Sequence, residues 1–280
     1  MSKRTVLITG CSSGFGRATA LEFLKAGWRV AATMRNTSEW HDGEPSEDLL
    51  LLELDVENIG SIKAAFAQAV ERFGKLDCVV NNAGRGLFSV FEATPMEAVR
   101  SLFETNVFGY MQVMQAAMPH FQANGGGRFI NVSSGSGIRP EPLMSIYGAS
   151  KHAIEEFTES VAYELATQNV SVKLIEPGMV KETNFLQHTR EISETIPFPS
   201  SYQPFVEQIM AMFLGRSPEG LGTEDEVAEA IVAAASDETE ELRIQVGCDT
   251  AEAARMRWET SETEYSAWTR SMFTATEKAS

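Results

Sequence analysis

Tyr147 and Lys151 are the two residues whose types and spacing most directly suggest chemistry. They are four positions apart in the segment SIYGASKHAIEEF, so in a helix they lie on one face and can interact. A tyrosine hydroxyl ordinarily has a pKa near ~10, and a neighbouring ammonium favours the phenolate and lowers that pKa. The phenol could then exchange a proton with an alcohol or a ketone near neutral pH. Ser134, thirteen residues earlier, could hold the substrate oxygen beside it.

A spacing of Tyr-x-x-x-Lys also fits an ordinary helix surface. Whether the pair is catalytic therefore depends on the elements around it. The stretch VLITGCSSGFGRATALEFL places Gly10, Gly14 and Gly16 between an apolar run and an amphipathic run, which predicts a strand-to-helix turn. Such a turn directs backbone N–H groups and the positive end of a helix at one spot, which suits a phosphate. The spacing is not G-x-G-x-x-G, and Arg17 follows Gly16 where a nucleoside-triphosphate loop would have lysine. A plain tight turn and a ligand-binding turn fit this spacing equally well.

Strand and helix patterns alternate along the chain. Strands are predicted at 5–9, 28–34, 49–56, 76–84, 127–134, 170–178 and 242–246, and helices near 15–26, 58–73, 104–123, 147–168 and 224–236. This alternation predicts an α/β fold: a doubly wound, mostly parallel seven-stranded sheet of Rossmann type with helices on both faces. Ligands in such sheets bind beyond the carboxyl ends of the strands. The glycine turn, NNAG, NVSS and EPG would all lie at that edge.

We expect residues 1–280 to form a single dinucleotide-binding catalytic domain. The segment 183–222 breaks the alternation and is rich in large apolar residues, which suits a lid over an apolar ligand. Extra core or a subunit contact is the alternative for this segment. A helical tail is expected over 251–280.

Composition narrows the classes of function. The net charge of −16 argues against nucleic acid as a partner, because an acidic surface repels phosphate backbones. The three cysteines are far apart and show neither a metal-ligand spacing nor a disulfide framework, so no metal is expected. No apolar run is long enough to cross a bilayer, and we expect a cytoplasmic protein without a signal peptide.

The end of the second predicted strand bears on the choice of cofactor. In dinucleotide folds an acid here holds the ribose hydroxyls of NAD, but this strand ends in AATMRN, with Arg35 in place of an acid. A guanidinium can bind a 2′-phosphate in bidentate fashion, so NADP (NADPH) is expected and NAD is less favoured. Arg17 could add positive charge, whereas Glu39 and Asp42 oppose it. A solvated surface side chain is the alternative for each arginine.

Taken together, these residues resemble the short-chain dehydrogenase/reductase family, in its shorter single-domain branch. The matching landmarks appear in the family's order: TGCSSGFG, Asp55-Val56, NNAG at 81–84, Asn106, Ser134, Tyr147 with Lys151, and Pro177-Gly178. The resemblance implies that Tyr147 is the catalytic acid/base, that Lys151 lowers its pKa and binds the nicotinamide ribose, and that Ser134 orients the carbonyl. It also implies that Asn106 helps to hold a water relay behind Lys151.

The resemblance also implies a set of cofactor contacts. The glycines of the turn would line the phosphates, Asp55 and Val56 would approach the adenine, and Pro177 and Gly178 would approach the nicotinamide. The full set expected at the cofactor is Gly10, Ser12, Ser13, Gly14, Phe15, Gly16, Arg35, Asp55, Val56, Asn82, Ala83, Gly84, Tyr147, Lys151, Pro177, Gly178 and Val180. For NNAG, stabilisation of the central sheet is the alternative role.

The segments YGASKHAIEEFTESVAYEL and ATMRN are most similar to the hydroxysteroid and retinol dehydrogenase-like members of the family. This similarity implies a lipophilic alcohol or ketone as substrate. Glu182 stands where the family often has a threonine, so the cofactor contact of Thr183 is an open question. The resemblance suggests a homodimer or homotetramer formed through the helices near 104–123 and 147–168. The alternatives are a non-catalytic NADP-binding sensor or interaction protein on the same fold, and an epimerase or dehydratase of related fold.

Overall fold

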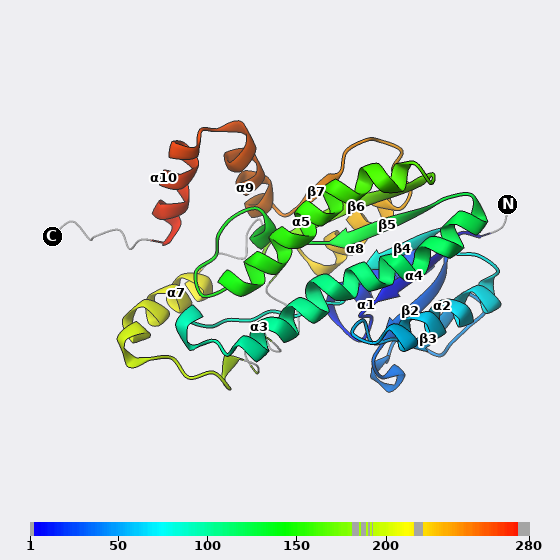
Figure 1. Ribbon diagram of the computed structural model, residues 1–280, viewed down its shortest axis with the longest axis horizontal. Helices are drawn as coiled ribbons and strands as arrows, with labels where there is room; N and C mark the ends of the chain where they lie inside the picture. Colours follow the sequence, from blue (N-terminus) through cyan, green and yellow to red (C-terminus); the bar gives the residue numbers. More distant parts are fainter. Residues whose placement is uncertain are drawn as a thin grey trace.

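The computed structural model describes residues 3–180, 193–215 and 221–273, together with Phe185, Thr189 and Glu191. Its centre is a seven-stranded sheet with the order β3-β2-β1-β4-β5-β6-β7 (Figure 1). The strands are β1 (Thr5–Thr9), β2 (Arg29–Met34), β3 (Leu49–Glu53), β4 (Cys78–Asn81), β5 (Gly127–Val132), β6 (Val170–Pro177) and β7 (Arg243–Val246). Every neighbouring pair is parallel, so the sheet is entirely parallel where the sequence predicted a mostly parallel one.

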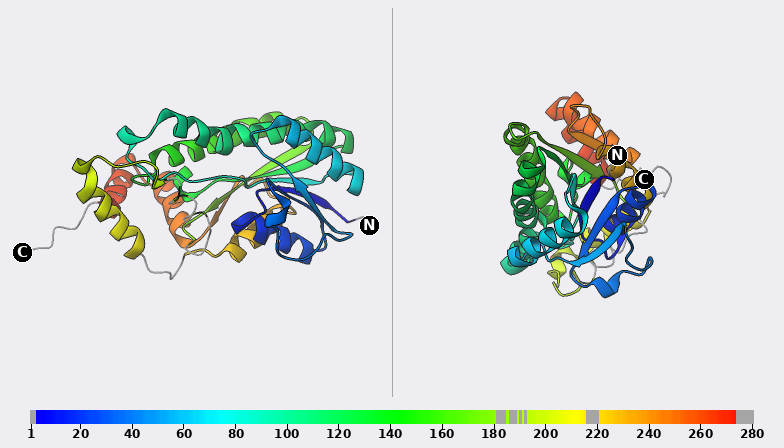
Figure 2. Two further views of the ribbon diagram at one scale, coloured as in Figure 1. Left: turned by 90° about the horizontal axis from the view of Figure 1, so that it is seen from below. Right: turned by 90° about the vertical axis from the view of Figure 1, so that its right-hand side faces the viewer.

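Helices cover both faces of the sheet, as the alternating pattern predicted (Figure 2). The helices are α1 (Gly14–Lys25), α2 (Ile59–Phe73), α3 (Met96–Phe103), α4 (Gly109–Asn124), α5 (Ser145–Ala166), α7 (Gln203–Gly215), α8 (Glu224–Ala234), α9 (Cys248–Glu259) and α10 (Glu262–Phe273). Helices α2, α4 and α5 pack on one face, and α1 and α8 pack on the other. The chain reverses direction across the sheet between β1 and β4, where ligands of such folds bind.

Helix α2 illustrates how the sequence sets these elements. Asn58 caps it by accepting hydrogen bonds from the backbone of Gly60 and Ser61, and Gly74, with a φ of 86°, ends it. Its apolar face is buried against the sheet, and complete burial of a side chain such as Phe66 stabilises the fold by about 1.5–3 kcal/mol.

The long helix expected near 104–123 is the main departure from the predicted elements. A π-helical turn (Glu104–Phe108) precedes α4, and α3, which was not predicted, precedes that turn. Single π-turns are rare and often mark functional sites. This one contains Asn106.

The carboxyl edge of the sheet is covered by the elements that break the alternation. Helix α7 lies within the expected lid, while α9 and α10 form the tail, which begins at Cys248 and so three residues before the expected start. Within the described part of the chain, no helix is both long enough and apolar enough to span a membrane.

Candidate active site

The glycine turn joins β1 to α1 at the carboxyl edge of the sheet. Gly10 (φ 74°) and Gly14 (φ 58°) have left-handed backbone conformations, which glycine adopts without strain. Gly16 allows a close approach: a Cβ there would lie 2.2 Å from the carbonyl oxygen of Gly10 and 2.4 Å from Nδ2 of Asn82. Backbone geometry therefore explains all three glycines.

The first turn of α1 fits an anion. Ser13 is the N-cap residue, but its side chain makes no capping hydrogen bond, so it does not occupy the N–H groups of the helix N-terminus. A Cβ on Gly14 would meet a single atom within 4 Å, at 3.8 Å, so the turn is open on this side. Ser12 and Phe15 flank this position. A helix N-terminus suits the phosphates of a dinucleotide.

The NNAG segment follows β4 and is bonded to the glycine turn. Asn82 Nδ2 donates hydrogen bonds to the carbonyl oxygens of Thr9 (2.9 Å) and Gly10 (3.1 Å). The backbone N–H groups of Asn82 and Ala83 both donate to Thr9 Oγ1, at 3.0 and 3.1 Å. These bonds give the segment a structural role in fixing the turn.

Arg35 directly follows β2 and is exposed. None of the ion pairs formed by the described residues involves it. Arg17, in contrast, pairs with Asp42, which holds the pKa of that carboxyl below its usual value. The charge of Asp42, which argued against a 2′-phosphate site near Arg35, is thus partly neutralised by Arg17. Arg35 itself is exposed to solvent.

Asp55 and Val56 lie just beyond β3, at the same edge of the sheet. Asp55 is half-buried, and its Oδ1 accepts a hydrogen bond from the backbone of Glu57 at 3.0 Å. Val56 is buried and packs against Gly109, the first residue of α4. The structure therefore gives Val56 a packing role beside any role at the cofactor.

Ser134 and Tyr147 meet where β5 ends and α5 begins. Tyr147 is 6 % exposed, and burial raises the pKa of its phenol. A hydrogen bond with the Ser134 hydroxyl lowers this pKa, and the nearby charge of Glu141 raises it. Desolvation is thus the largest effect on the phenol, and the lowering of this pKa by Lys151 stays a prediction.

Lys151 is buried one helical turn beyond Tyr147. Its Nζ donates a hydrogen bond to the carbonyl oxygen of Val132 at 2.9 Å and lies 5.8 Å from the centroid of the Tyr147 ring and 5.5 Å from that of Tyr110. Burial lowers the pKa of Lys151 to about 8, and the charge of Glu155 opposes this shift. The ammonium thus lies beside the phenol ring while its hydrogen bond goes to the backbone of β5.

Asn106 is held rigidly in the π-helical turn. Its Oδ1 accepts from the backbone N–H of Arg85 (3.0 Å), and its Nδ2 donates to the carbonyl of Arg85 (2.9 Å) and to Ser150 Oγ (3.1 Å). A Cβ on Gly84 would lie 3.4 Å from Asn106 Oδ1 and 3.8 Å from Lys151 Nζ. The structure therefore brings NNAG, Asn106 and Lys151 together.

Pro177 and Gly178 end β6 and are in contact with the tail. A Cβ on Gly178 would lie 1.9 Å from Oδ1 of Asp249, and Oδ2 of Asp249 accepts from the backbone of Met179 at 3.2 Å. Arg139, which is 3 % exposed, pairs with the same carboxylate at 3.1 Å. This ion pair, buried on the Arg139 side, holds α9 against the loop that was expected to approach the nicotinamide.

The lid segment is described only in part. The ring of Phe185 lies 5.4 Å from the ring of Tyr147, centroid to centroid, and Ile196 belongs to the same apolar cluster. Val180, three residues before the segment begins, is buried. Thr183 lies outside the described residues.

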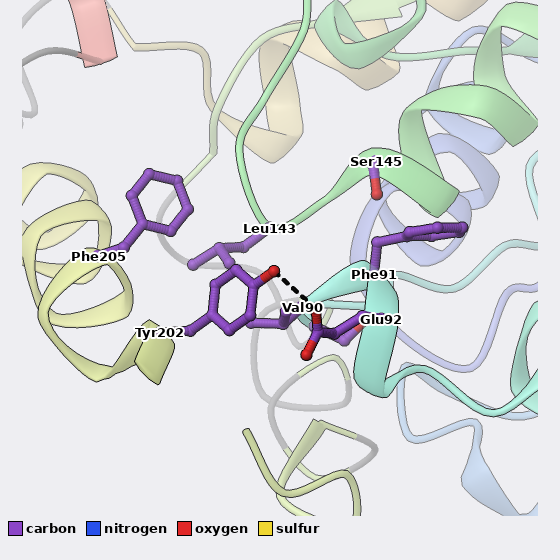
Figure 3. A pocket seen from close by; sticks show the side chains of 8 residues that line it. Val90, Phe91, Glu92, Leu143, Ser145, Tyr202 and Phe205 are labelled. Carbon is purple, nitrogen blue, oxygen red and sulfur yellow. Dashed lines mark hydrogen bonds between the residues drawn. The ribbon is translucent and has the colours of Figure 1, made fainter. Parts of the chain in front are cut away.

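A pocket of about 280 Å³ opens between α7 and the loops after β4 and β5 (Figure 3). It is lined by Ser89, Val90, Phe91, Glu92, Leu143, Ser145, Tyr202 and Phe205. The Tyr202 hydroxyl donates to Glu92 Oε2 at 2.9 Å across the pocket. Tyr147 is not part of its lining, but Ser145 is only two residues away along α5.

Several charged residues at the site were not predicted from the sequence. Arg139 and Asp249 are far apart in the chain, and nothing in the local pattern pairs them. The sequence did hold signals for Glu155 and Glu176: Glu155 is four residues after Lys151, and Glu176 lies in a buried strand directly after Leu174 and Ile175. Within the described residues, no group of three or more His, Cys, Asp or Glu side chains is placed to hold a metal ion.

Comparison with known proteins agrees with this geometry. A family model described as short chain dehydrogenase matches residues 4–194. An uncharacterized oxidoreductase of Bacillus subtilis is 32% identical over 256 residues, covering 88% of this chain and 90% of the relative. Retinol dehydrogenase 8 of Bos taurus is 34% identical over 227 residues, covering 77% of this chain and 71% of the relative.

Solved structures of similar fold include complexes with either cofactor. A short-chain dehydrogenase from Streptomyces avermitilis has a TM-score of 0.79 at 29% identity and covers 97% of both chains. One from Burkholderia cenocepacia in complex with NADP has a TM-score of 0.74 at 25% identity, covering 98% of both chains. A 3-ketoacyl-(acyl-carrier-protein) reductase from Brucella melitensis, complexed with NADH, has a TM-score of 0.71 at 26% identity, covering 88% of this chain and 97% of that one.

The parallel sheet and the residues at its carboxyl edge define a Rossmann-type dinucleotide fold. The chain belongs to the short-chain dehydrogenase/reductase family and is an NAD(P)-dependent oxidoreductase acting on CH–OH or C=O groups.

Proposed function

We propose that this protein is an NADP-preferring oxidoreductase that interconverts a lipophilic secondary alcohol and its ketone, with Tyr147 as the acid/base. The observation that carries the proposal is that Ser134 and Tyr147 lie together, with buried Lys151 beside the phenol ring, at the sheet edge that also holds the glycine turn. The bound nicotinamide would supply or accept the hydride. The residues of the chain would position the substrate and move the proton.

Each of the three residues has a distinct role in this proposal. In ketone reduction, the phenol of Tyr147 donates its proton to the carbonyl oxygen, and the Ser134 hydroxyl donates a hydrogen bond to the same oxygen. Lys151 stabilises the phenolate that remains. The burial that raises the pKa of Tyr147 keeps the phenol protonated, which is the form that reduction requires.

The surroundings of Tyr147 support a lipophilic substrate. The phenol belongs to an apolar cluster with Leu87, Leu102, Met144, Ile146 and Ile196, against which Phe185 packs. Such a lining favours a carbonyl on an apolar framework over a charged or sugar-like one. The likeness to retinol dehydrogenase 8, whose name specifies a lipophilic alcohol, points to the same substrate class. We also assign the segment 183–222 the role of a lid over this cluster, within a single catalytic domain.

A panel of aliphatic, aromatic and steroid-like ketones, assayed with NADPH and with NADH, tests the proposal. We expect turnover of several apolar ketones and little turnover of polar ones, with NADPH as the better reductant. The non-catalytic alternative predicts tight NADPH binding without turnover of any member of the panel. Faster turnover of polar carbonyl compounds would contradict the assigned substrate class.

Arg35 carries the proposed preference for NADP. We expect Arg35→Ala to weaken NADPH binding about ten- to a hundredfold, because a charge-assisted hydrogen bond to the 2′-phosphate contributes about 1.5–3 kcal/mol. NADH binding should change little, since NADH lacks that phosphate. Fluorescence titration with both nucleotides measures the two affinities.

Arg17→Ala is the matched control for Arg35→Ala, because Arg17 is already paired with Asp42. It should reduce NADPH affinity less than Arg35→Ala does. Equal losses of NADPH and NADH affinity in Arg35→Ala would contradict the assigned contact.

Exposed apolar side chains support assembly through α4 and α5, as a homodimer or homotetramer. Phe108, just before α4, is 47% exposed, and Tyr163 on α5 is 79% exposed. Exposed aromatic residues on helices that flank one another suit a subunit contact.

A further inference from the structure

Two buried carboxyl groups lie beneath the proposed catalytic residues and have no part in the mechanism above. Glu155 is on α5, four residues after Lys151, and Glu176 is on β6, directly before Pro177. Glu155 is 7 % exposed and Glu176 is 0 % exposed. Carboxyl groups are seldom buried to this extent unless each charge is compensated.

One oxygen of each carboxyl in this pair forms no hydrogen bond among the described residues. Oε2 of Glu155 accepts from Arg243 Nε at 3.1 Å, and Oε2 of Glu176 accepts from Gln245 Nε2 at 2.5 Å. These oxygens, Oε1 of each, are buried, with the unpartnered Ser133 hydroxyl beside Glu155 and Arg243 Nε 3.4 Å from Oε1 of Glu176. The two carboxyls are within hydrogen-bonding reach of each other, so one proton between them satisfies both oxygens.

The surrounding charges indicate the same protonation state. The charged groups that face the pair are Arg243 from β7 and Lys151 and Glu159 from α5. Two ionised carboxyls together with Glu159 would outnumber these two cations, whereas a single shared proton balances the charge. Burial and the charge of Glu155 raise the pKa of Glu176 to about 8, and burial also raises the pKa of Glu155, so the pair holds a proton near neutral pH.

We propose that Glu155 and Glu176 share a single proton at neutral pH and that the negative charge left on Glu155 acts as the buried counter-ion of Lys151. Residues four apart on a helix are neighbours, so the carboxylate lies one turn beneath the ammonium. Glu155 and Glu176 are thus positioning residues that act through Lys151. The inference concerning Lys151 rests on the catalytic role proposed for it, whereas the shared proton does not.

Infrared spectroscopy detects the shared proton directly. At pH 6–7 the protein should show the carbonyl band of a protonated carboxylic acid, and the band should fade as the pH rises through about 8. Glu176→Gln should lack the band while remaining folded, because the amide can still donate a hydrogen bond to Glu155. Glu159→Gln is the matched control, since Glu159 pairs with the same Arg243 but its side chain is 51% exposed, and it should retain the band. A wild-type spectrum without the band, or an unchanged band in Glu176→Gln, would overturn the proposal.

The shared proton also makes stability depend on pH. The pKa of Glu176 is about 8 in the folded protein and ordinarily 4.5, so between these values the folded state binds more protons than the unfolded chain. The free energy of unfolding therefore falls as the pH rises across this window. Thermal unfolding should show a smaller decline of Tm between pH 5 and 8 in Glu176→Gln than in the wild type. An identical decline in both proteins would count against the assignment.

The counter-ion role has its own readout in the pH dependence of ketone reduction. Glu155 opposes the lowering of the Lys151 pKa, so Glu155→Gln should lower this pKa further. The alkaline limb of the kcat profile should move to lower pH, by on the order of one unit, while Glu159→Gln leaves it in place. An unmoved limb in Glu155→Gln would refute the counter-ion role. If the infrared band behaves as expected and no variant or wild-type protein reduces ketones, the proposed function fails and the shared proton stands.

Discussion

Replacing Tyr147 with phenylalanine is expected to lower kcat for ketone reduction by about 10²- to 10⁴-fold, the range that a positioned proton donor contributes. The phenylalanine ring preserves the packing against Phe185 and the apolar cluster, so the fold should be retained. NADPH affinity should change by less than about tenfold, because the glycine turn and Arg35 are untouched. Steady-state kinetics with a ketone from the panel, and a fluorescence titration with NADPH, measure the two quantities.

Tyr110→Phe is a matched control for this variant. Tyr110 is also a fully buried phenol, its ring centroid lies 5.5 Å from Lys151 Nζ, and burial raises its pKa. Its hydroxyl donates to the carbonyl of Val132 at 3.0 Å and does not contact Ser134 in the structure. We expect Tyr110→Phe to retain most of the activity. Similar losses in both variants would show that the effect arises from disturbed packing around Lys151, and Tyr147 would lose its assigned role.

The fold was predictable from the sequence because its signals are local and repeated. Each strand is a short apolar run, each covering helix has a buried stripe, and parallel connections allow few topologies. The ends of the helices and strands were harder to predict from the sequence. The helix expected from 104 begins as a π-helical turn, because the side chain of Asn106 bonds the loop at Arg85, a contact that sequence periodicity does not reveal.

The candidate site was predictable in its members but not in its electrostatics. The spacing from Ser134 to Tyr147 and Lys151 identified three side chains that the structure brings together. Sequence spacing reveals a neighbouring charge but not the depth of burial, which raises the pKa of the Tyr147 phenol. The contact between Arg139 and Asp249 joins a loop to the first turn of α9, 110 positions away in the sequence, and only the folded chain shows it.

Replacing Gly16 with alanine is expected to weaken NADPH binding on the order of ten- to a hundredfold. The added Cβ would lie 2.2 Å from the carbonyl oxygen of Gly10 and 2.4 Å from Nδ2 of Asn82. Moving either atom would disturb hydrogen bonds, because the Asn82 amide donates to the carbonyls of Thr9 and Gly10. The turn must therefore shift. Overpacking of this kind costs about 1–3 kcal/mol. If that cost is taken from the free energy of NADPH binding, it converts to the stated change in affinity. Titration with NADPH measures the loss, and far-UV circular dichroism verifies the fold.

Gly60→Ala provides the control, since a Cβ on Gly60 would meet only Oδ1 of Asn58, at 3.2 Å, and Gly60 lies in α2, outside the glycine turn. It should bind NADPH as the wild type does. The Gly16 and Tyr147 variants should also differ in kind: the first loses cofactor affinity, and the second loses turnover with the cofactor still bound. Wild-type NADPH affinity in a folded Gly16→Ala protein would mean that the phosphates lie elsewhere, because a displaced turn could not present its N–H groups to them unchanged. The phenol would then no longer share a sheet edge with the nicotinamide, and the assignment of Tyr147 would fail together with that of the glycines.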